Sequence, residues 1–79
     1  MHVRVKLFAN LSRGITGALP GTPFDVPLPQ GATVDDLIGQ LNLPRQEVKI
    51  AFVNGRSRPM DWPLVNGDEV GIFPLVGGG

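Results

Sequence analysis

The chain has 79 residues, of which 42% are hydrophobic and 18% charged, so it suits one small folded domain rather than a disordered segment. Seven basic residues balance seven acidic ones, which argues against a nucleic-acid-binding protein, because that class normally carries a basic face. Cysteine is absent, which excludes disulfides and cysteine-ligated metals. No stretch has the length or apolar character of a membrane span or a signal peptide, so we expect a cytoplasmic protein without a membrane partner.

The first part of the chain shows two stretches with the periodicity of strands. Residues 2–8 alternate apolar and basic side chains, which predicts a half-buried strand. Residues 9–21 contain three glycines and a proline and predict a long connection, with a short helical turn around residues 10–13. Residues 24–28 alternate again, but prolines lie within and beside them. Proline cannot donate to a ladder, so this second strand should lie at a sheet edge.

A short capped helix is predicted next. Thr33 is a good N-cap residue, and Asp36 falls at the third helical position, near the positive end of the helix dipole. Apolar residues then follow at helical spacing, at Val34, Leu37, Ile38 and Leu41. Pro44 follows the end of this helix, whose stability must come from burial against a sheet.

The last part of the chain predicts a hairpin and a final strand. Residues 48–53 alternate and stop at Asn54-Gly55, a strong hairpin signal, which leaves room for a short strand around Arg58. Residues 69–73 form the last strand, and a crossover through the helix would make the first and last strands neighbours. The sequence therefore predicts an α+β, β-grasp (ubiquitin-like) domain over residues 1–74. Its mixed sheet has four to five strands crossed by one main helix, and a flexible tail occupies residues 75–79.

The pattern resembles the ubiquitin-like sulfur carriers of the MoaD/ThiS family over essentially the whole chain. The motifs that carry the resemblance are Val5-Lys6-Leu7-Phe8-Ala9, the capped helix, Val53-Asn54-Gly55, and the turn and strand of residues 64–74 followed by Gly77-Gly78-Gly79. Residues 8–11 and Phe73-Pro74 are most similar to MoaD, the small subunit of molybdopterin synthase. Gly77 is instead typical of ThiS, so the residues leave the pathway open.

The resemblance implies a defined chemistry at Gly79. A MoeB/ThiF-type enzyme would use ATP to adenylate the terminal carboxylate, and a sulfur donor system would convert it to a thiocarboxylate. A MoaE-like large subunit would then use this sulfur in molybdopterin (molybdenum or tungsten cofactor) biosynthesis. The small protein itself would hold no cofactor and no metal.

Residues near the tail have roles that follow from their chemistry. Gly77 and Gly78 lack side chains and suit a channel only wide enough for backbone. Apolar residues before the glycines are candidate partner-binding residues, namely Phe8, Phe73, Pro74, Leu75 and Val76. For Phe8 and Phe73, ordinary packing at the end of a sheet is an equally good interpretation.

The remaining polar residues do not form an internal catalytic constellation. The chain has no tyrosine, two lysines and one histidine, His2, which we expect to face solvent. We expect the protein to be non-catalytic alone and to act within a sulfurtransferase complex. Structural roles are expected for several others: helix capping for Asp35 and Asp36, turn formation and solubilisation of an edge for Asp68 and Glu69, covering of the core for Trp62, and solvated loops for Arg45, Lys49, Arg56 and Arg58.

Three other functions remain compatible with these residues. The sulfur could serve thiamin thiazole synthesis, cysteine synthesis or tRNA thiolation. The protein could instead be a modifier that joins Gly79 to lysines of other proteins. A β-grasp interaction module whose glycines are inert is the structural alternative.

Overall fold

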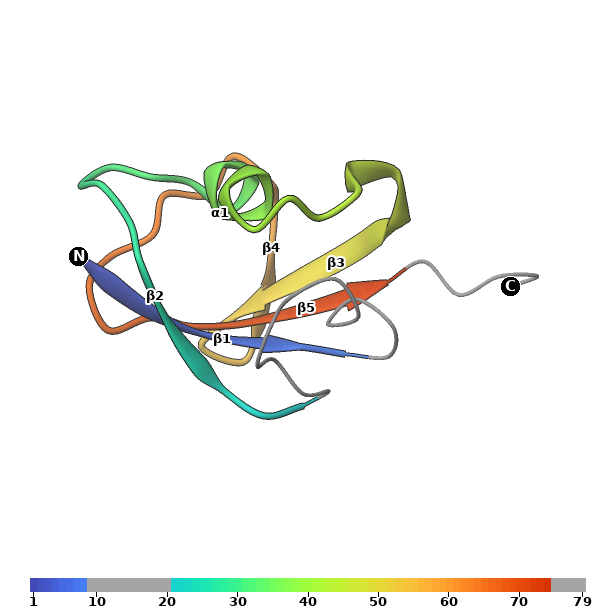
Figure 1. Ribbon diagram of the computed structural model, residues 1–79, viewed down its shortest axis with the longest axis horizontal. Coiled ribbons are helices and arrows are strands. Elements are labelled where there is room, and N and C mark those ends of the chain that lie inside the picture. Colours follow the sequence, from blue (N-terminus) through green and yellow to red (C-terminus); the bar gives the residue numbers. More distant parts are fainter. Residues whose placement is uncertain (9–20, 75–79) are drawn as a thin grey trace.

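The computed structural model describes residues 1–8 and 21–74 and has one sheet crossed by one α-helix (Figure 1). The elements, in chain order, are β1 (His2–Leu7), β2 (Phe24–Pro27), α1 (Val34–Gln40), the 3-10 helix η2 (Arg45–Glu47), β3 (Val48–Val53), β4 (Arg56–Arg58) and β5 (Glu69–Pro74). The sheet has five strands in the order β2-β1-β5-β3-β4. This confirms the predicted β-grasp architecture. No helix in the described part of the chain is long and apolar enough to cross a membrane.

The first and last strands are neighbours at the centre of the sheet, as predicted. β1 and β5 run parallel, with Val5 opposite Val70 and Leu7 opposite Ile72. β2 pairs antiparallel with β1 and forms one edge of the sheet. Its edge position explains how a strand with Pro27 is tolerated, because one side of an edge strand donates to no neighbour.

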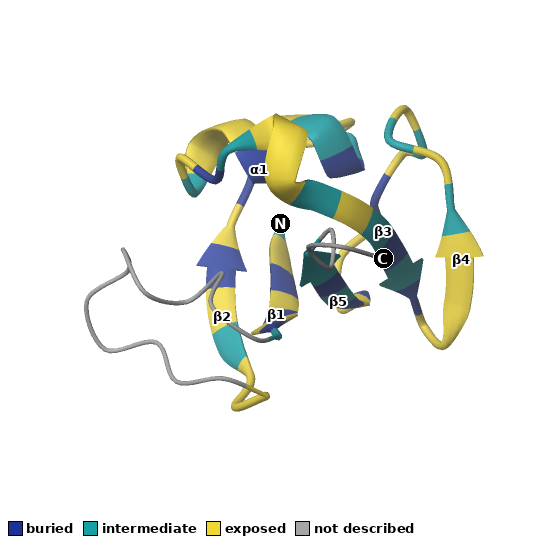
Figure 2. Ribbon diagram, turned by 90° about the vertical axis from the view of Figure 1, so that its right-hand side faces the viewer, coloured by how far each residue is buried: buried dark blue, intermediate teal, exposed yellow. Residues whose placement is uncertain are grey.

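The hydrophobic core lies between α1 and one face of the sheet (Figures 1 and 2). Val34, Leu37 and Ile38 of α1 are almost completely buried against alternate residues of the strands. The strand residues in this layer are Val3, Val5, Leu7, Val26, Ala51, Val53, Val70 and Ile72. Partly buried residues, including Trp62, pack around the margin, which confirms the expected place of Trp62 over the core.

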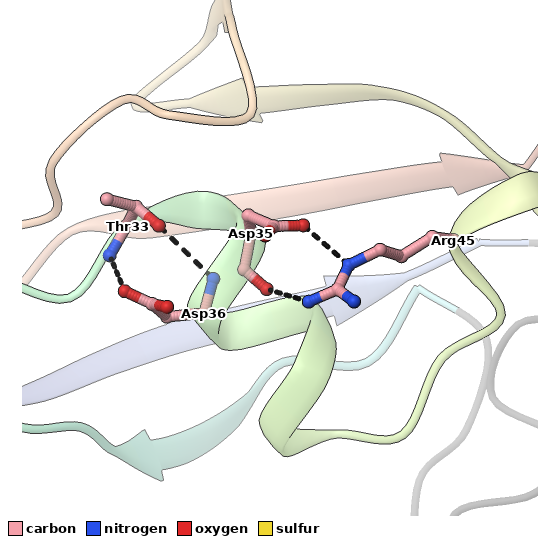
Figure 3. Close-up of polar contacts among 4 residues, drawn as sticks. All are labelled: Thr33, Asp35, Asp36 and Arg45. Carbon is pink, nitrogen blue, oxygen red and sulfur yellow. Dashed lines mark hydrogen bonds and ion pairs between the residues drawn. The ribbon is translucent and has the colours of Figure 1, made fainter.

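The start of α1 is fixed by a capping box (Figure 3). The Asp36 backbone N–H donates to the Thr33 Oγ1 at 3.2 Å, and the Thr33 N–H donates to the Asp36 carboxylate at 2.9 Å. The predicted cap is therefore confirmed for these two residues. Asp35 has a different role, because it receives a 2.6 Å contact from the Arg45 Nε and so joins the helix to η2.

A hydrogen-bonded clip joins the β3–β4 hairpin to the turn before β5. Asn54 and Gly55 have φ angles of 52° and 84°, as the predicted tight turn requires. The Asn54 Nδ2 donates to Asp68 at 2.9 Å, and the Val65 N–H donates to the other Asp68 oxygen at 2.8 Å. The turn role of Asp68 is confirmed. The expectation that Asp68 and Glu69 solubilise an edge is wrong, because β5 is central and Asp68 is buried.

Candidate functional site

The sheet face opposite α1, called here the open face, is not covered by any other described element (Figure 2). Side chains of a strand alternate between faces, so the residues between the buried positions point here. β1 places Arg4 and Lys6 on this face, and both are exposed. β3 and β5 instead place apolar groups on it, since Ile50 pairs with Phe73 and Phe52 pairs with Gly71. The open face is therefore basic along β1 and apolar toward β3.

Three phenylalanine rings form an aromatic cluster on the open face. Phe8 and Phe73 are stacked, with ring centroids 4.2 Å apart and planes 3° from parallel. Phe52 meets Phe73 edge to face at 5.5 Å. Phe8 continues the β1–β5 ladder, because its N–H donates to the Ile72 carbonyl at 3.1 Å. All three rings are half-buried, so each retains surface for another molecule.

A shallow groove of about 400 Å³ runs beside this cluster. The three rings line it together with Arg4, Lys6 and Glu69. Gly71 lies beneath two of the rings: a Cβ at this position would lie 3.4 Å from the Phe8 Cε2 and 3.6 Å from the Phe73 Cε1. The missing side chain lets the rings lie close to the backbone of β5. The groove therefore offers an apolar surface to another molecule, and the cations Arg4 and Lys6 lie at one margin of it.

The structure brings together Phe8, Phe73 and Pro74 of the predicted partner-binding residues. Phe73 and Pro74 end β5, and Pro74 lies opposite Val48. The other predicted site residues, Leu75, Val76, Gly77, Gly78 and Gly79, lie outside the described residues. The point at which the chain leaves the sheet toward these residues is therefore next to the aromatic cluster.

Phe52 is a member of the cluster that sequence reasoning missed. The signal was present in the alternation of residues 48–53, where Ala51 and Val53 occupy the buried face. Phe52 must then face the other way, and the Asn54-Gly55 turn fixes it beside Gly71. The small size of Ala51 made the choice of buried face ambiguous from the sequence.

Titratable groups add little chemistry to the described part of the site. Within residues 1–8 and 21–74, no three His, Cys, Asp or Glu side chains are grouped so that they could hold a metal ion. Asp68 is the buried charged residue in this part of the chain, and both of its oxygens accept structural hydrogen bonds. The described open face therefore presents an aromatic groove with Arg4 and Lys6 in its lining.

The fold and this surface define a ubiquitin-like β-grasp protein of the class that contains ThiS/MoaD-type sulfur carriers and small archaeal-type protein modifiers. The ThiS family model matches residues 5–79, so the chain belongs to the ThiS family. No curated protein sequence matches the chain.

Solved structures with this fold agree with that assignment. A Pyrococcus furiosus protein described as molybdopterin converting factor subunit 1 is 32% identical, with a TM-score of 0.73 over 96% of this chain and 99% of that chain. Small archaeal modifier protein 1 of Haloferax volcanii is 25% identical, with a TM-score of 0.69 over 95% and 98% of the two chains. A complex of subunits 1 and 2 of the molybdopterin-converting factor from Helicobacter pylori has a matching chain that is 19% identical. Its TM-score is 0.61 over 100% of both chains, and at this identity the likeness concerns the fold alone.

Proposed function

We propose that the protein is a sulfur carrier whose Gly79 carboxylate is activated and converted to a thiocarboxylate. The observation that carries the proposal is the match to the ThiS family through the terminal residues Gly77, Gly78 and Gly79. The position of the aromatic cluster supports the proposal, because the cluster lies at the end of β5, after which the chain continues with residues 75–79. The domain of residues 1–74 would bind the partners, and residues 75–79 would enter them as a flexible tail.

The chemistry follows from the poor reactivity of a carboxylate as an acyl donor. A MoeB/ThiF-type enzyme would join the Gly79 carboxylate to AMP from ATP, with release of pyrophosphate. Sulfur from a donor system would then displace AMP and leave a C-terminal thiocarboxylate. This group is a nucleophile at neutral pH, whereas within residues 1–8 and 21–74 no three His, Cys, Asp or Glu side chains are grouped as for a metal ion. The acid-base groups would come from the partner enzyme.

We further propose that the sulfur serves molybdopterin biosynthesis, with this chain as small subunit of molybdopterin synthase. The 32% identity to the Pyrococcus furiosus protein supports this pathway. The partner would be a MoaE-like large subunit, by analogy with the two-subunit complex from Helicobacter pylori. Phe8, Phe73, Pro74, Leu75 and Val76 would dock on it, and Gly77 and Gly78 would thread its channel.

Intact-mass spectrometry tests the carrier proposal directly. The full chain is incubated with ATP, a MoeB/ThiF-type enzyme and a sulfur donor, and we expect the mass gain of one oxygen-to-sulfur exchange. Fragmentation should place the change on Gly79. A chain lacking Gly77, Gly78 and Gly79 is the matched control and should keep its mass, because it ends in Val76. A full chain that never gains this mass with any such enzyme contradicts the proposal.

Protein modification is the second candidate, and the 25% identity to the archaeal modifier favours it. In this function Gly79 would form an isopeptide bond with a lysine of another protein. Peptide mapping of cellular proteins separates the two functions. A C-terminal peptide of this chain attached through Gly79 to a lysine side chain would indicate protein modification. A pull-down with the intact tail separates the sulfur pathways, because a MoaE-like protein indicates molybdopterin synthesis and a thiazole synthase indicates thiamin synthesis.

A further inference from the structure

A second groove lies near the β4 edge of the sheet. It has a volume of about 340 Å³ and is lined by the exposed Arg56 and Val65 and the half-buried Arg58 and Trp62, among others; we call it the Arg-Trp groove. Arg56 and Arg58 pair with Val53 and Ala51, whose side chains lie on the buried face. Paired residues share a face. The Arg-Trp groove therefore opens on the opposite side of the sheet from the aromatic cluster, and one partner can bind each without competition.

The two guanidinium groups of the groove are available to a ligand. Within the described part of the chain, neither forms a salt bridge, whereas Arg4 and Arg45 both do. The Arg58 guanidinium lies 4.1 Å from the centroid of the Trp62 ring. Stacking fixes the plane of the guanidinium and leaves its N–H edge free, and this edge matches the two oxygens of a carboxylate. Arg58 is thus preorganised for a bidentate contact.

The rim of the groove is also rigid and apolar. Among the described residues, Val65 is the large hydrophobic residue with an exposed side chain, at 62% exposure. Its N–H donates to the Asp68 carboxylate, and its carbonyl accepts from the Asp68 N–H at 3.1 Å. An exposed side chain on a fixed backbone loses little freedom when a partner covers it. Arginine and tryptophan are also the residues that most often dominate protein interfaces.

We propose that the Arg-Trp groove binds an acidic segment of a partner protein. Carboxylates of the segment would pair with Arg56 and Arg58, and an aliphatic side chain would rest on Val65. Asp68 in the groove wall keeps its negative charge, but its oxygens accept from Asn54 and Val65, and among the described residues it forms no salt bridge with either arginine. Nucleic acid fits less well, since the chain has no net charge and the groove supplies two cations. The proposal does not depend on Gly79.

The experiment uses Trp62 as a unique reporter, because it is the only tryptophan in the chain. The ¹⁵N-labelled full chain is titrated with a capped peptide of sequence Glu-Leu-Glu-Glu-Leu-Glu, and the Trp62 indole N–H signal is followed by NMR. We expect a saturable shift of this signal. The same peptide with glutamine in place of glutamate should bind at least about tenfold more weakly, because a hydrogen bond between two charged groups is stronger than one to a neutral amide.

Variants assign the binding to the two arginines. Arg56→Gln combined with Arg58→Gln should raise the Kd for the acidic peptide by about tenfold or more. Arg45→Gln is the matched control, because Arg45 is an exposed arginine that pairs with Asp35 and does not line the groove, and it should leave the Kd unchanged. Arg58→Lys keeps the charge but removes the planar fork, so it should weaken binding. Retained dispersion of the valine and leucine methyl signals checks that each variant is folded.

Four results would overturn the proposal. The first is an indole signal that does not move with the acidic peptide, and the second is equal affinity for the glutamine peptide. The third is equal weakening by Arg45→Gln, and the fourth is tighter binding of a single-stranded oligothymidylate than of the peptide. A chain lacking Gly78 and Gly79 should bind the peptide as the full chain does. Failure of this groove therefore leaves the sulfur-carrier proposal untouched, and the reverse also holds.

Discussion

The rings of Phe8 and Phe73 lie face to face, 4.2 Å apart, although the two residues come from opposite ends of the chain. The parallel pairing of β1 with β5 produces this contact, because it places Leu7 opposite Ile72 and carries the ladder on to Phe8. A stacked pair contributes about 0.5–1.5 kcal/mol beyond its buried area. The pair is half-buried, so packing and partner binding are both roles for these rings, and variants can separate them.

Replacing Phe73 with alanine should weaken partner binding more than it weakens the fold. We expect the Kd for a MoaE-like large subunit to rise by about tenfold or more, because aromatic anchors dominate interfaces. Phe24→Ala is the matched control, since Phe24 packs on the core margin from β2 and pairs with the buried Val5 rather than lying in the aromatic cluster. Calorimetric binding and urea unfolding are measured on both variants. If Phe24→Ala weakens binding as much as Phe73→Ala, the aromatic cluster is packing rather than a docking surface.

Gly71 should tolerate alanine but not a large side chain. An alanine Cβ would make ordinary contacts with the two rings, at 3.4 Å and 3.6 Å, so Gly71→Ala should bind the large subunit normally. Gly71→Leu would occupy the volume of the rings and separate Phe8 from Phe73. Position 71 faces away from the core. The urea unfolding midpoint of Gly71→Leu should therefore fall by less than the midpoint of a core variant, Leu37→Ala. Unchanged partner affinity in Gly71→Leu would show that the ring stack is dispensable.

The clip between Asn54 and Asp68 should make a large contribution to stability. Asn54→Ala removes the donor to Asp68 and the oxygen that accepts from the Glu69 N–H at 3.0 Å. It also places alanine in the left-handed region, at a φ angle of 52°, which alanine disfavours. We expect a loss of about 2–4 kcal/mol in the free energy of unfolding. Asn54→Gly keeps the backbone conformation and loses the side-chain bonds, so its loss should be smaller. Equal losses in urea unfolding would assign the whole effect to the hydrogen bonds.

Features governed by short-range patterns were predictable from the sequence. The N-cap at Thr33, the Asn54-Gly55 turn and the edge position of β2 each depend on residues close together in the chain, and all three are confirmed. The burial of Asp68 was not predictable, because its partners Asn54 and Val65 meet it only once two turns come together. The stacking of Arg58 on Trp62 joins residues only four apart, and it was missed because Arg58 was expected to lie in a solvated loop. The contact of Asn54 with Asp68 therefore depends on how distant segments pack together, which local patterns do not indicate.

The capping box should stabilise α1 by an amount typical of helix caps. Thr33→Ala removes the acceptor for the Asp36 N–H, and we expect a loss of about 1 kcal/mol in the free energy of unfolding. Thr33→Ser keeps the hydroxyl and should change it by much less. Arg45→Gln breaks an ion pair whose side chains are 60% and 46% exposed, so its effect should be below about 1 kcal/mol. Thermal unfolding of the three variants checks this order, and a larger effect of Arg45→Gln than of Thr33→Ala would contradict it.

A side chain at Gly78 should separate docking from sulfur loading. If Gly78 threads a channel only wide enough for backbone, Gly78→Val blocks delivery of the Gly79 carboxylate to the activating enzyme, since valine adds bulk and restricts the backbone. The aromatic cluster is unchanged in this variant, so binding to the large subunit should weaken by less than about tenfold. Intact mass should then show no thiocarboxylate while calorimetry still detects the complex. Normal thiocarboxylate formation by Gly78→Val would mean that the partner site admits side chains, and the reason proposed for the glycines would be wrong.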